Sequence, residues 1–162
     1  MKKYLPCLLL ISSTCFAGDL GINYGLGLDG PEITDVKFFS ASYKEPWVND
    51  IIYYKGEIGF WADSKSNGLT RNSSAFGSGS VGVEIRNETF YVSDYFGLAG
   101  ITATDNYTSS PYEFQTDLGL GFKDSKTKAM IGAEFKHFSN AGIVGPNLGR
   151  DFITIKVQVP FL

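Results

Sequence analysis

Cysteine is scarce in this sequence of 162 residues: Cys7 and Cys15 are the two that it contains. Both fall within residues 1–17, which we interpret as a secretory signal peptide, so residues 18–162 carry no thiol. A chain without a thiol has no disulfide, no metal-thiolate site and no cysteine nucleophile. The length of residues 18–162 is typical of a single domain.

The N-terminus has the three parts of a signal peptide. Met1-Lys2-Lys3 is basic, the run from Leu5 to Ile11 is apolar, and small and polar residues then lead to Ala17. We expect cleavage after Ala17. The alternative is a lipoprotein cut before Cys15, but Ser12-Ser13-Thr14 lacks the Leu and the Gly or Ala that usually precede such a cut.

Basic clusters and long apolar runs are also missing after residue 17. The formal net charge of the whole sequence is −3, and loss of Lys2 and Lys3 would make it −5, which argues against nucleic acid as a partner. No apolar run after the signal approaches the roughly 18 residues that a membrane helix requires. Tyr, Phe and Gly are plentiful instead. Such a chain can still span a membrane as a β-barrel, because closure pairs every backbone group.

Apolar and small or polar residues alternate strictly in several segments, and this period of two is typical of strands. The clearest segments lie at 20–28, 52–62, 81–86, 114–122, 127–139 and 151–161, and weaker ones lie near 35–43 and 89–103. These segments predict an all-β chain of eight strands. Alternation alone would also fit a soluble β-sandwich.

The connections between these segments favour the barrel. They are short near residues 86–88 and 123–126, and long near 63–77, 104–112 and 140–150. Short and long connections alternate in outer-membrane barrels as periplasmic turns and extracellular loops. A connection near residues 44–50 looks too long for a tight turn and fits less well. We therefore predict an eight-stranded antiparallel transmembrane β-barrel of the outer membrane, with both termini on the periplasmic side.

Three polar residues fall on the lipid-facing rows of the last two strands. In the seventh strand Glu134 and Lys136 share one face, and His137 and Ser139 share the other. Because the charged row of a barrel strand faces the interior, His137 and Ser139 are expected to face lipid. By the same parity Asp151 falls on the lipid-facing row of the eighth strand.

The hairpin formed by these two strands is expected to bring His137, Ser139 and Asp151 together at the cell exterior. The eleven steps from Lys126 to His137, at about 3.3 Å each and tilted about 40°, rise roughly 28 Å, slightly more than the apolar band of such barrels. His137 should therefore lie near the ester level of the outer leaflet.

Polar groups that face lipid are costly and call for a functional reason. A serine hydroxyl becomes a nucleophile when a histidine takes its proton and an acid orients that histidine. His137 is the only histidine in the chain, so any histidine-based mechanism must use it. The alternative is a rim histidine with a neighbouring serine and a solvated loop acid.

The motif His137-Phe138-Ser139-Asn140-Ala141-Gly142-Ile143, followed by Pro146-Asn147 and an acid at Asp151, resembles the signature of the PagL-type lipid A 3-O-deacylases. The resemblance implies an eight-stranded barrel that hydrolyses the 3-linked hydroxyacyl ester of lipid A in the outer leaflet. It implies lipopolysaccharide as the substrate, outer-membrane lipids as surroundings, and neither cofactor nor metal. It also leaves open a homodimer.

Roles follow from the resemblance by position. It implies Ser139 as the nucleophile, His137 as the general base, Asp151 as the orienting acid, the Gly142 amide and the Asn147 side chain as oxyanion donors, and Asn140 as a support of the loop. The alternative for Gly142 and Asn147 is that both are turn residues. The sequence departs from the pattern in having Asp rather than Glu at 151, and in ending on Leu162 rather than on an aromatic residue.

Two other functions remain in view. A lipid A acyltransferase is also a small barrel with polar catalytic groups, but it would need an interior pocket for an acyl chain. A non-catalytic adhesion or structural barrel would need no chemistry at 137, 139 and 151. Arg71 and Arg150, in or beside exterior loops, are interpreted as solvated charges or, alternatively, as contacts for lipid A phosphates.

Overall fold

The computed structural model describes residues 18–29, 32–62, 64–66, 69–145 and 147–161. The expected signal peptide and Pro146 lie outside these residues, so the cleavage site stays a prediction. None of the described residues forms a helix long and apolar enough to cross a membrane.

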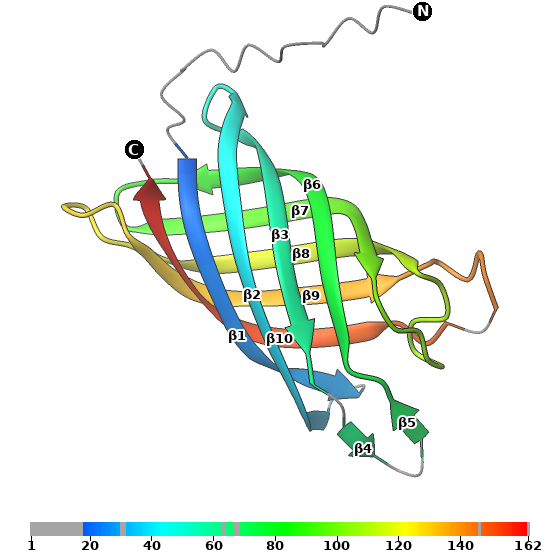
Figure 1. Cartoon of the computed structure of the whole chain (residues 1–162). Coiled ribbons are helices and arrows are strands. Elements are labelled where there is room, and N and C mark those ends of the chain that lie inside the picture. The colour runs from blue at the N-terminus through cyan, green and yellow to red at the C-terminus, as the bar shows by residue number, and fades with distance from the viewer. Residues whose placement is uncertain (1–17, 30–31, 63, 67–68, 146, 162) are drawn as a thin grey trace, which may run out of the picture.

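Eight strands close into one antiparallel barrel in the order β1-β10-β9-β8-β7-β6-β3-β2 (Figure 1). Their bounds are β1 Gly18–Asp29, β2 Glu32–Val48, β3 Ile52–Trp61, β6 Ser74–Arg86, β7 Phe90–Ile101, β8 Tyr112–Lys123, β9 Met130–Ser139 and β10 Arg150–Phe161. Two short strands, β4 Ser64–Ser66 and β5 Leu69–Arg71, pair as a separate hairpin between β3 and β6. The prediction of an eight-stranded antiparallel barrel is confirmed.

Pairing of the first strand with the last closes the sheet. Gly18 lies opposite Phe161 and Leu28 lies opposite Asp151, so β1 starts at the rim where β10 ends. The connections at 49–51, 87–89 and 124–129 lie at this rim, and those at 62–73, 102–111 and 140–149 lie at the other. We call the first rim periplasmic and the second external.

The expected long connection near residues 44–50 is wrong. Strand β2 continues to Val48, and the turn to β3 comprises three residues, in which Asn49 and Asp50 have positive φ angles of 50° and 54°. The strand pairing shifts between Pro46 and Val48, which marks a bulge. Proline lacks an amide hydrogen and is tolerated at a bulge, so it interrupts the alternation without ending the strand.

Two other boundaries differ from the expectation. Strand β6 begins at Ser74, within the loop expected at 63–77, and β9 begins at Met130 rather than at residue 127. Both differences lie at strand ends, where alternating polarity fades.

Ionic groups fill the middle of the barrel interior. Three lysines pair there with carboxylates: Lys136 Nζ lies 2.9 Å from Glu57, Lys156 Nζ lies 2.8 Å from Glu134, and Lys55 pairs with Asp117. Glu134 and Lys136 therefore point inward, as the alternation predicted. Buried charges persist only when they are paired, and each of these charges has a partner of opposite sign.

Aromatic side chains pack in the interior near the external rim. Phe38 lies 4.7 Å from Phe152 between ring centroids, and Trp61 lies 5.4 Å from Phe138. Together with Phe76 they belong to one buried apolar cluster. The interior at this level is filled by side chains.

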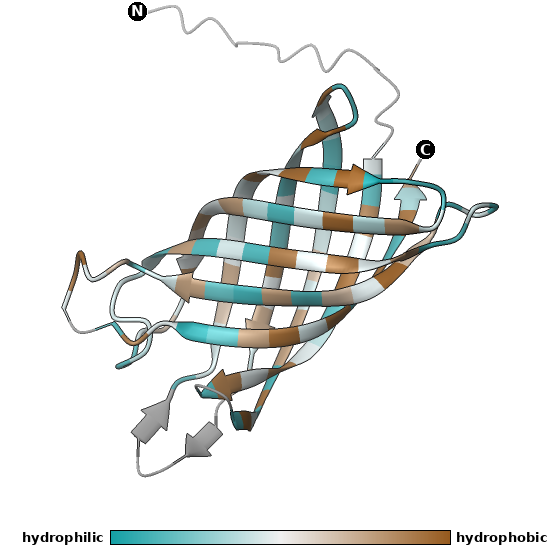
Figure 2. Ribbon diagram, turned by 180° about the vertical axis from the view of Figure 1, so that it is seen from behind, coloured by the Kyte–Doolittle hydropathy of each residue, from teal (hydrophilic) through white to brown (hydrophobic). Residues whose placement is uncertain are grey.

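Hydropathy alternates along the barrel strands (Figure 2), and the exposed side chains of the outer face are largely apolar. The outward rows carry exposed aliphatic and aromatic side chains, among them Ile22, Ile58, Val83, Leu98, Leu120 and Ile155. This apolar surface suits contact with lipid tails.

Asp94 on β7 is a charged residue within these largely apolar outward rows. It is exposed on the outward row, with Val83 opposite it on β6 and Leu118 opposite it on β8. Among the described residues none forms a hydrogen bond or ion pair with its carboxylate. A lipid-facing carboxylate between two aliphatic neighbours should lower the stability of the barrel.

Replacing Asp94 by Leu should raise the free energy of unfolding by about 1–2 kcal/mol, since the cost of a lipid-facing acid is smaller than that of a lipid-facing base. Denaturant unfolding in phospholipid vesicles measures the change. The matched control is Asp117→Leu, which should lower it by about 3–5 kcal/mol because Lys55 loses its buried partner. A loss of stability in Asp94→Leu would mean that the carboxylate has a favourable contact in the membrane.

Candidate functional site

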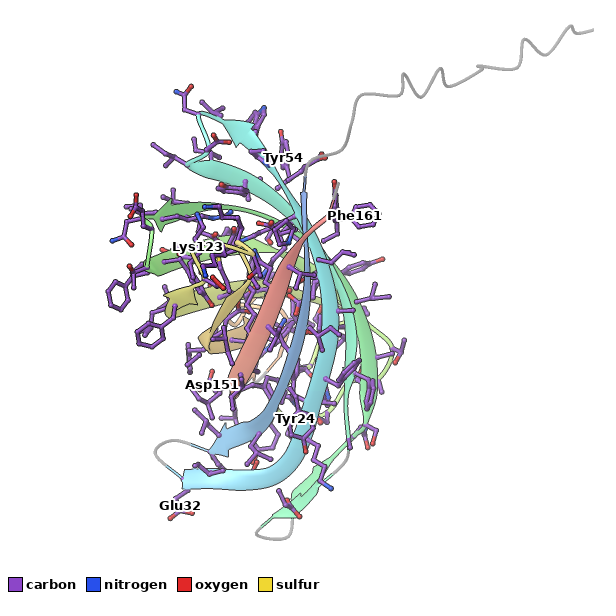
Figure 3. The ribbon with its side chains drawn as sticks, turned by 90° about the vertical axis from the view of Figure 1, so that its left-hand side faces the viewer. Tyr24, Glu32, Tyr54, Lys123, Asp151 and Phe161 are labelled. Atoms are coloured by element: carbon purple, nitrogen blue, oxygen red, sulfur yellow. The ribbon has the colours of Figure 1, made fainter. Side chains whose placement is uncertain are left out.

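Strand register places His137 and Asp151 directly opposite each other on β9 and β10. His137 Nδ1 lies 2.5 Å from Asp151 Oδ1, and the two side chains are 40% and 34% exposed on the outer face of the barrel. Figure 3 shows Asp151 at the end of β10 away from Phe161, which is the external rim. The pair therefore faces outward at the external end of the hairpin.

Ser139 lies on the same outward row as His137, two residues further along β9, and opposite Phe114. Its Oγ accepts a hydrogen bond of 3.1 Å from the Ala141 amide. In the described part of the chain no hydrogen bond joins His137 to Ser139. Hydrogen bonds between catalytic groups often form only when substrate binds, so two residues on one row of β9 can still act as a nucleophile and its base.

Asn140 organises the loop that follows β9. Its Nδ2 donates to Ser109 Oγ and to the Val144 carbonyl, each at 3.0 Å, and its Oδ1 accepts from the Gly142 amide at 2.9 Å. Gly142 has a φ angle of 74°, which favours glycine. These contacts fit a supporting role for Asn140, and they engage the Gly142 amide.

The Asn147 side chain is held at both ends. Its Nδ2 donates to Glu113 Oε2 at 3.0 Å, and its Oδ1 accepts from the Gly149 amide at 2.8 Å. A carboxamide has two N–H groups, so one remains for another acceptor. Sequence reasoning missed Glu113, because the only signal for it is an inward-facing acid at the external end of β8.

Arg150 is buried beneath the site, and the expectation of a solvated charge is wrong. Its guanidinium pairs with Asp105 and lies 5.2 Å from the centre of the Trp61 ring. Burial opposes ionisation of Asp105, but Arg150 and the amides of Asn72, Thr108 and Tyr107 outweigh it, so the pKa of Asp105 is lowered. The residue that precedes Asp151 is thus tied to the 102–111 loop.

Gly149 packs directly against the imidazole of His137. It has a φ angle of 73°, and a Cβ placed on it would lie 2.8 Å from His137 Cε1. Its amide also donates to the Tyr107 carbonyl at 3.0 Å. The backbone of Gly149 therefore forms one wall of the space that holds the histidine ring.

One group of carboxylates has the spacing of a metal site. Glu57, Asp117 and Glu134 offer oxygens within 4.8 Å of one another in the barrel interior. Lys55 and Lys136 are paired with these same oxygens, so their charge is already compensated. The group contributes to the interior ion network rather than to the outward-facing site.

The geometry defines a class of protein: an outer-membrane β-barrel that carries a paired histidine and acid beside a serine on its lipid-facing side. Residues 37–160 match the family model described as "Lipid A 3-O-deacylase (PagL)". The chain belongs to this family of outer-membrane esterases.

One curated relative agrees with this assignment, and solved structures share the fold. The chain is 28% identical over 153 residues to "Lipid A deacylase PagL" of Bordetella bronchiseptica, and the match covers 89% of this chain and 84% of that protein. The crystal structure of the outer membrane enzyme PagL matches with a TM-score of 0.65 at 16% identity, covering 88% of this chain and 99% of that one. Ail, the attachment invasion locus protein of Yersinia pestis, matches with a TM-score of 0.53 at 12% identity, covering 89% and 95%. At these identities the two structures establish the fold alone.

Replacing Gly149 by Ala should displace the His137 ring, because the added methyl group would lie 2.8 Å from His137 Cε1. We expect deacylation of lipid A to fall by about 100-fold. The matched control is Gly145→Ala. It introduces alanine at a similar φ of 59°, but its Cβ would lie 3.9 Å from Ser109. Mass spectrometry of lipid A measures turnover, and thermal unfolding measures the backbone strain that both variants share. Equal losses in the two variants would show that strain, and not His137, is affected.

Proposed function

We propose that this chain hydrolyses the 3-linked hydroxyacyl ester of lipid A in the outer leaflet, with Ser139 as nucleophile, His137 as general base and Asp151 as orienting acid. The hydrogen bond between His137 and Asp151 on the outward face carries this proposal. This bond joins an acid and a base at the external rim. Ser139, the only serine of β9, lies on the same outward row as His137.

Asp151 prepares His137 for proton transfer. Its carboxylate accepts the Nδ1–H of the imidazole, which leaves the lone pair of Nε2 available. Ser139 Oγ attacks the ester carbonyl carbon while Nε2 takes the hydroxyl proton. The resulting imidazolium is stabilised by the negative charge of Asp151.

The second half of the reaction releases both products. The tetrahedral intermediate expels the sugar oxygen, which receives the proton held by His137, and the hydroxyacyl group remains on Ser139. Water then attacks this acyl-enzyme as His137 takes one of its protons, and Ser139 Oγ leaves with that proton. The products are the lipid A alcohol and a free hydroxy fatty acid.

The Gly142 amide and the Asn147 carboxamide are proposed to stabilise the oxyanion. Asn147 can do so with its second N–H while the first stays on Glu113. The Gly142 amide must exchange Asn140 for the oxyanion. Donors of this kind act mainly on the charge that develops in the transition state.

The packed interior argues against acyl transfer by a lumenal pocket. At the level of the site the interior holds Phe38, Trp61, Phe138 and Phe152. A substrate that enters from the membrane instead meets His137 and Asp151 on the outer face. The outward orientation thus favours hydrolysis of an ester that lies in the surrounding lipid.

Incubation of purified protein with lipid A should remove the mass of one hydroxyacyl chain, and Ser139→Ala should lower the rate by several powers of ten. The barrel should still fold, because Ser139 lies outside the packed interior. Mass spectrometry follows the reaction, and heat-modifiable migration on gels reports folding. A mass gain would indicate acyl transfer, and no change would favour a structural barrel. A comparable rate in Ser139→Ala would exclude Ser139 as nucleophile.

Asp151→Asn should lower turnover by up to about 10⁴-fold, because it removes the charge opposite the imidazolium and permits the wrong tautomer of His137. Asp151→Glu should retain a substantial part of the activity, since it keeps the charge and adds one methylene. Single-turnover assays on lipid A compare the three proteins. If Asn and Glu were both as active as Asp, His137 and Ser139 would act as a dyad.

A further inference from the structure

The loop at 140–149, which joins β9 to β10, exposes large apolar side chains at the external rim. Ile143 is 72% exposed, Leu148 is 68% exposed, and Val144 is 50% exposed. External loops normally meet water, and an aqueous position for three aliphatic side chains is unfavourable. Their exposure therefore needs a partner that is itself apolar.

Backbone groups of this loop form hydrogen bonds with the 102–111 loop. Ser109 Oγ donates to the Val144 carbonyl at 2.5 Å, and the Leu148 and Gly149 amides donate to carbonyls of Asn106 and Tyr107 at 3.5 and 3.0 Å. These bonds fasten the loop to the 102–111 loop. They hold the backbone at Val144, Leu148 and Gly149, while the side chains of Ile143, Val144 and Leu148 stay exposed.

The loop continues the lipid-facing surface of the barrel. It starts directly after Ser139 on the outward row and extends beyond the end of β9, along the tilted direction of that strand (Figure 1). Tyr112, 74% exposed at the external start of β8, lies on the outward row of the adjacent strand. The exposed apolar row of these strands therefore ends next to the exposed apolar side chains of the loop.

We propose that the 140–149 loop inserts Ile143, Val144 and Leu148 into the boundary between the headgroups and the acyl chains of the outer leaflet and so holds Ser139 at the depth of the lipid ester. Interfacial segments bind membranes in this way, by burying an apolar side while the polar side stays out. The inference deepens the proposed function and rests on it, because the depth of Ser139 matters only if Ser139 attacks an ester in the leaflet.

Spin labels can measure the depth of the loop without reference to catalysis. Residues 18–162 lack cysteine, so single cysteines introduced by Ile143→Cys and by Leu148→Cys take the label specifically. The control is Thr104→Cys, at an exposed position of the polar 102–111 loop. The proteins are folded into phosphatidylcholine vesicles, and the accessibility of each label to oxygen and to a water-soluble nickel chelate is compared.

The labels at 143 and 148 should be more accessible to oxygen than to nickel, and the label at 104 should show the reverse. Equal nickel access at all three positions would overturn the proposal. Low access to both reagents with dipolar broadening would also overturn it, because a second copy of the chain would then cover the loop.

Kinetic measurements give a second test of the proposal. The double variant Ile143→Ser, Leu148→Ser should raise KM for bilayer lipid A about tenfold or more, with kcat changed less than twofold. Hydrolysis of p-nitrophenyl butyrate, a water-soluble ester, should be unchanged. Unchanged KM for lipid A would overturn the inserted loop. If the unaltered protein cleaved neither ester, the proposed function would fail, and the spin labels would still decide the position of the loop.

Discussion

Closure of the sheet between β1 and β10 fixes the side of the barrel that every side chain faces. A slip of one residue in any strand pair would exchange its two faces. On β9 that slip would move Glu134 and Lys136 into lipid, away from their interior partners. The cost of exposing those charges holds the register in place, and the same register sets His137 opposite Asp151. The site therefore depends on ion pairs that never contact it.

The interior changes in character along the barrel axis. Ion pairs among Lys55, Lys136, Asp117 and Glu134 occupy the middle, and stacked aromatic rings occupy the external end. Arg150 joins the aromatic layer to the loops, since its guanidinium lies over Trp61 and pairs with Asp105. Its neighbour Asp151 points outward. A rigid, filled interior can thus support a polar pair on the opposite face of the same strand.

Sequence reasoning reached the barrel and the outward position of residues 137, 139 and 151, because parity is a local property of each strand. It failed near residues 44–50, where a bulge at Pro46 interrupted the alternation but not the strand. It also missed Glu113 and Gly149. Their contacts with Asn147 and His137 depend on how separate segments meet at the rim, and no spacing within the sequence records such a meeting.

Two outward carboxylates show why the site lies at the rim. Asp94 stands between aliphatic neighbours on β7, where lipid offers neither water nor a counter-charge. Asp151 is the second residue of β10, next to the 140–149 loop, and it is partly exposed and hydrogen-bonded to His137. The proposed hydrolysis needs a transient His137 imidazolium and a water molecule, and both are unfavourable deep in hydrocarbon. A lipid ester, however, lies below the aqueous surface. An external strand end is the position that gives the proposed triad access to water while the apolar surface beneath it suits contact with acyl chains.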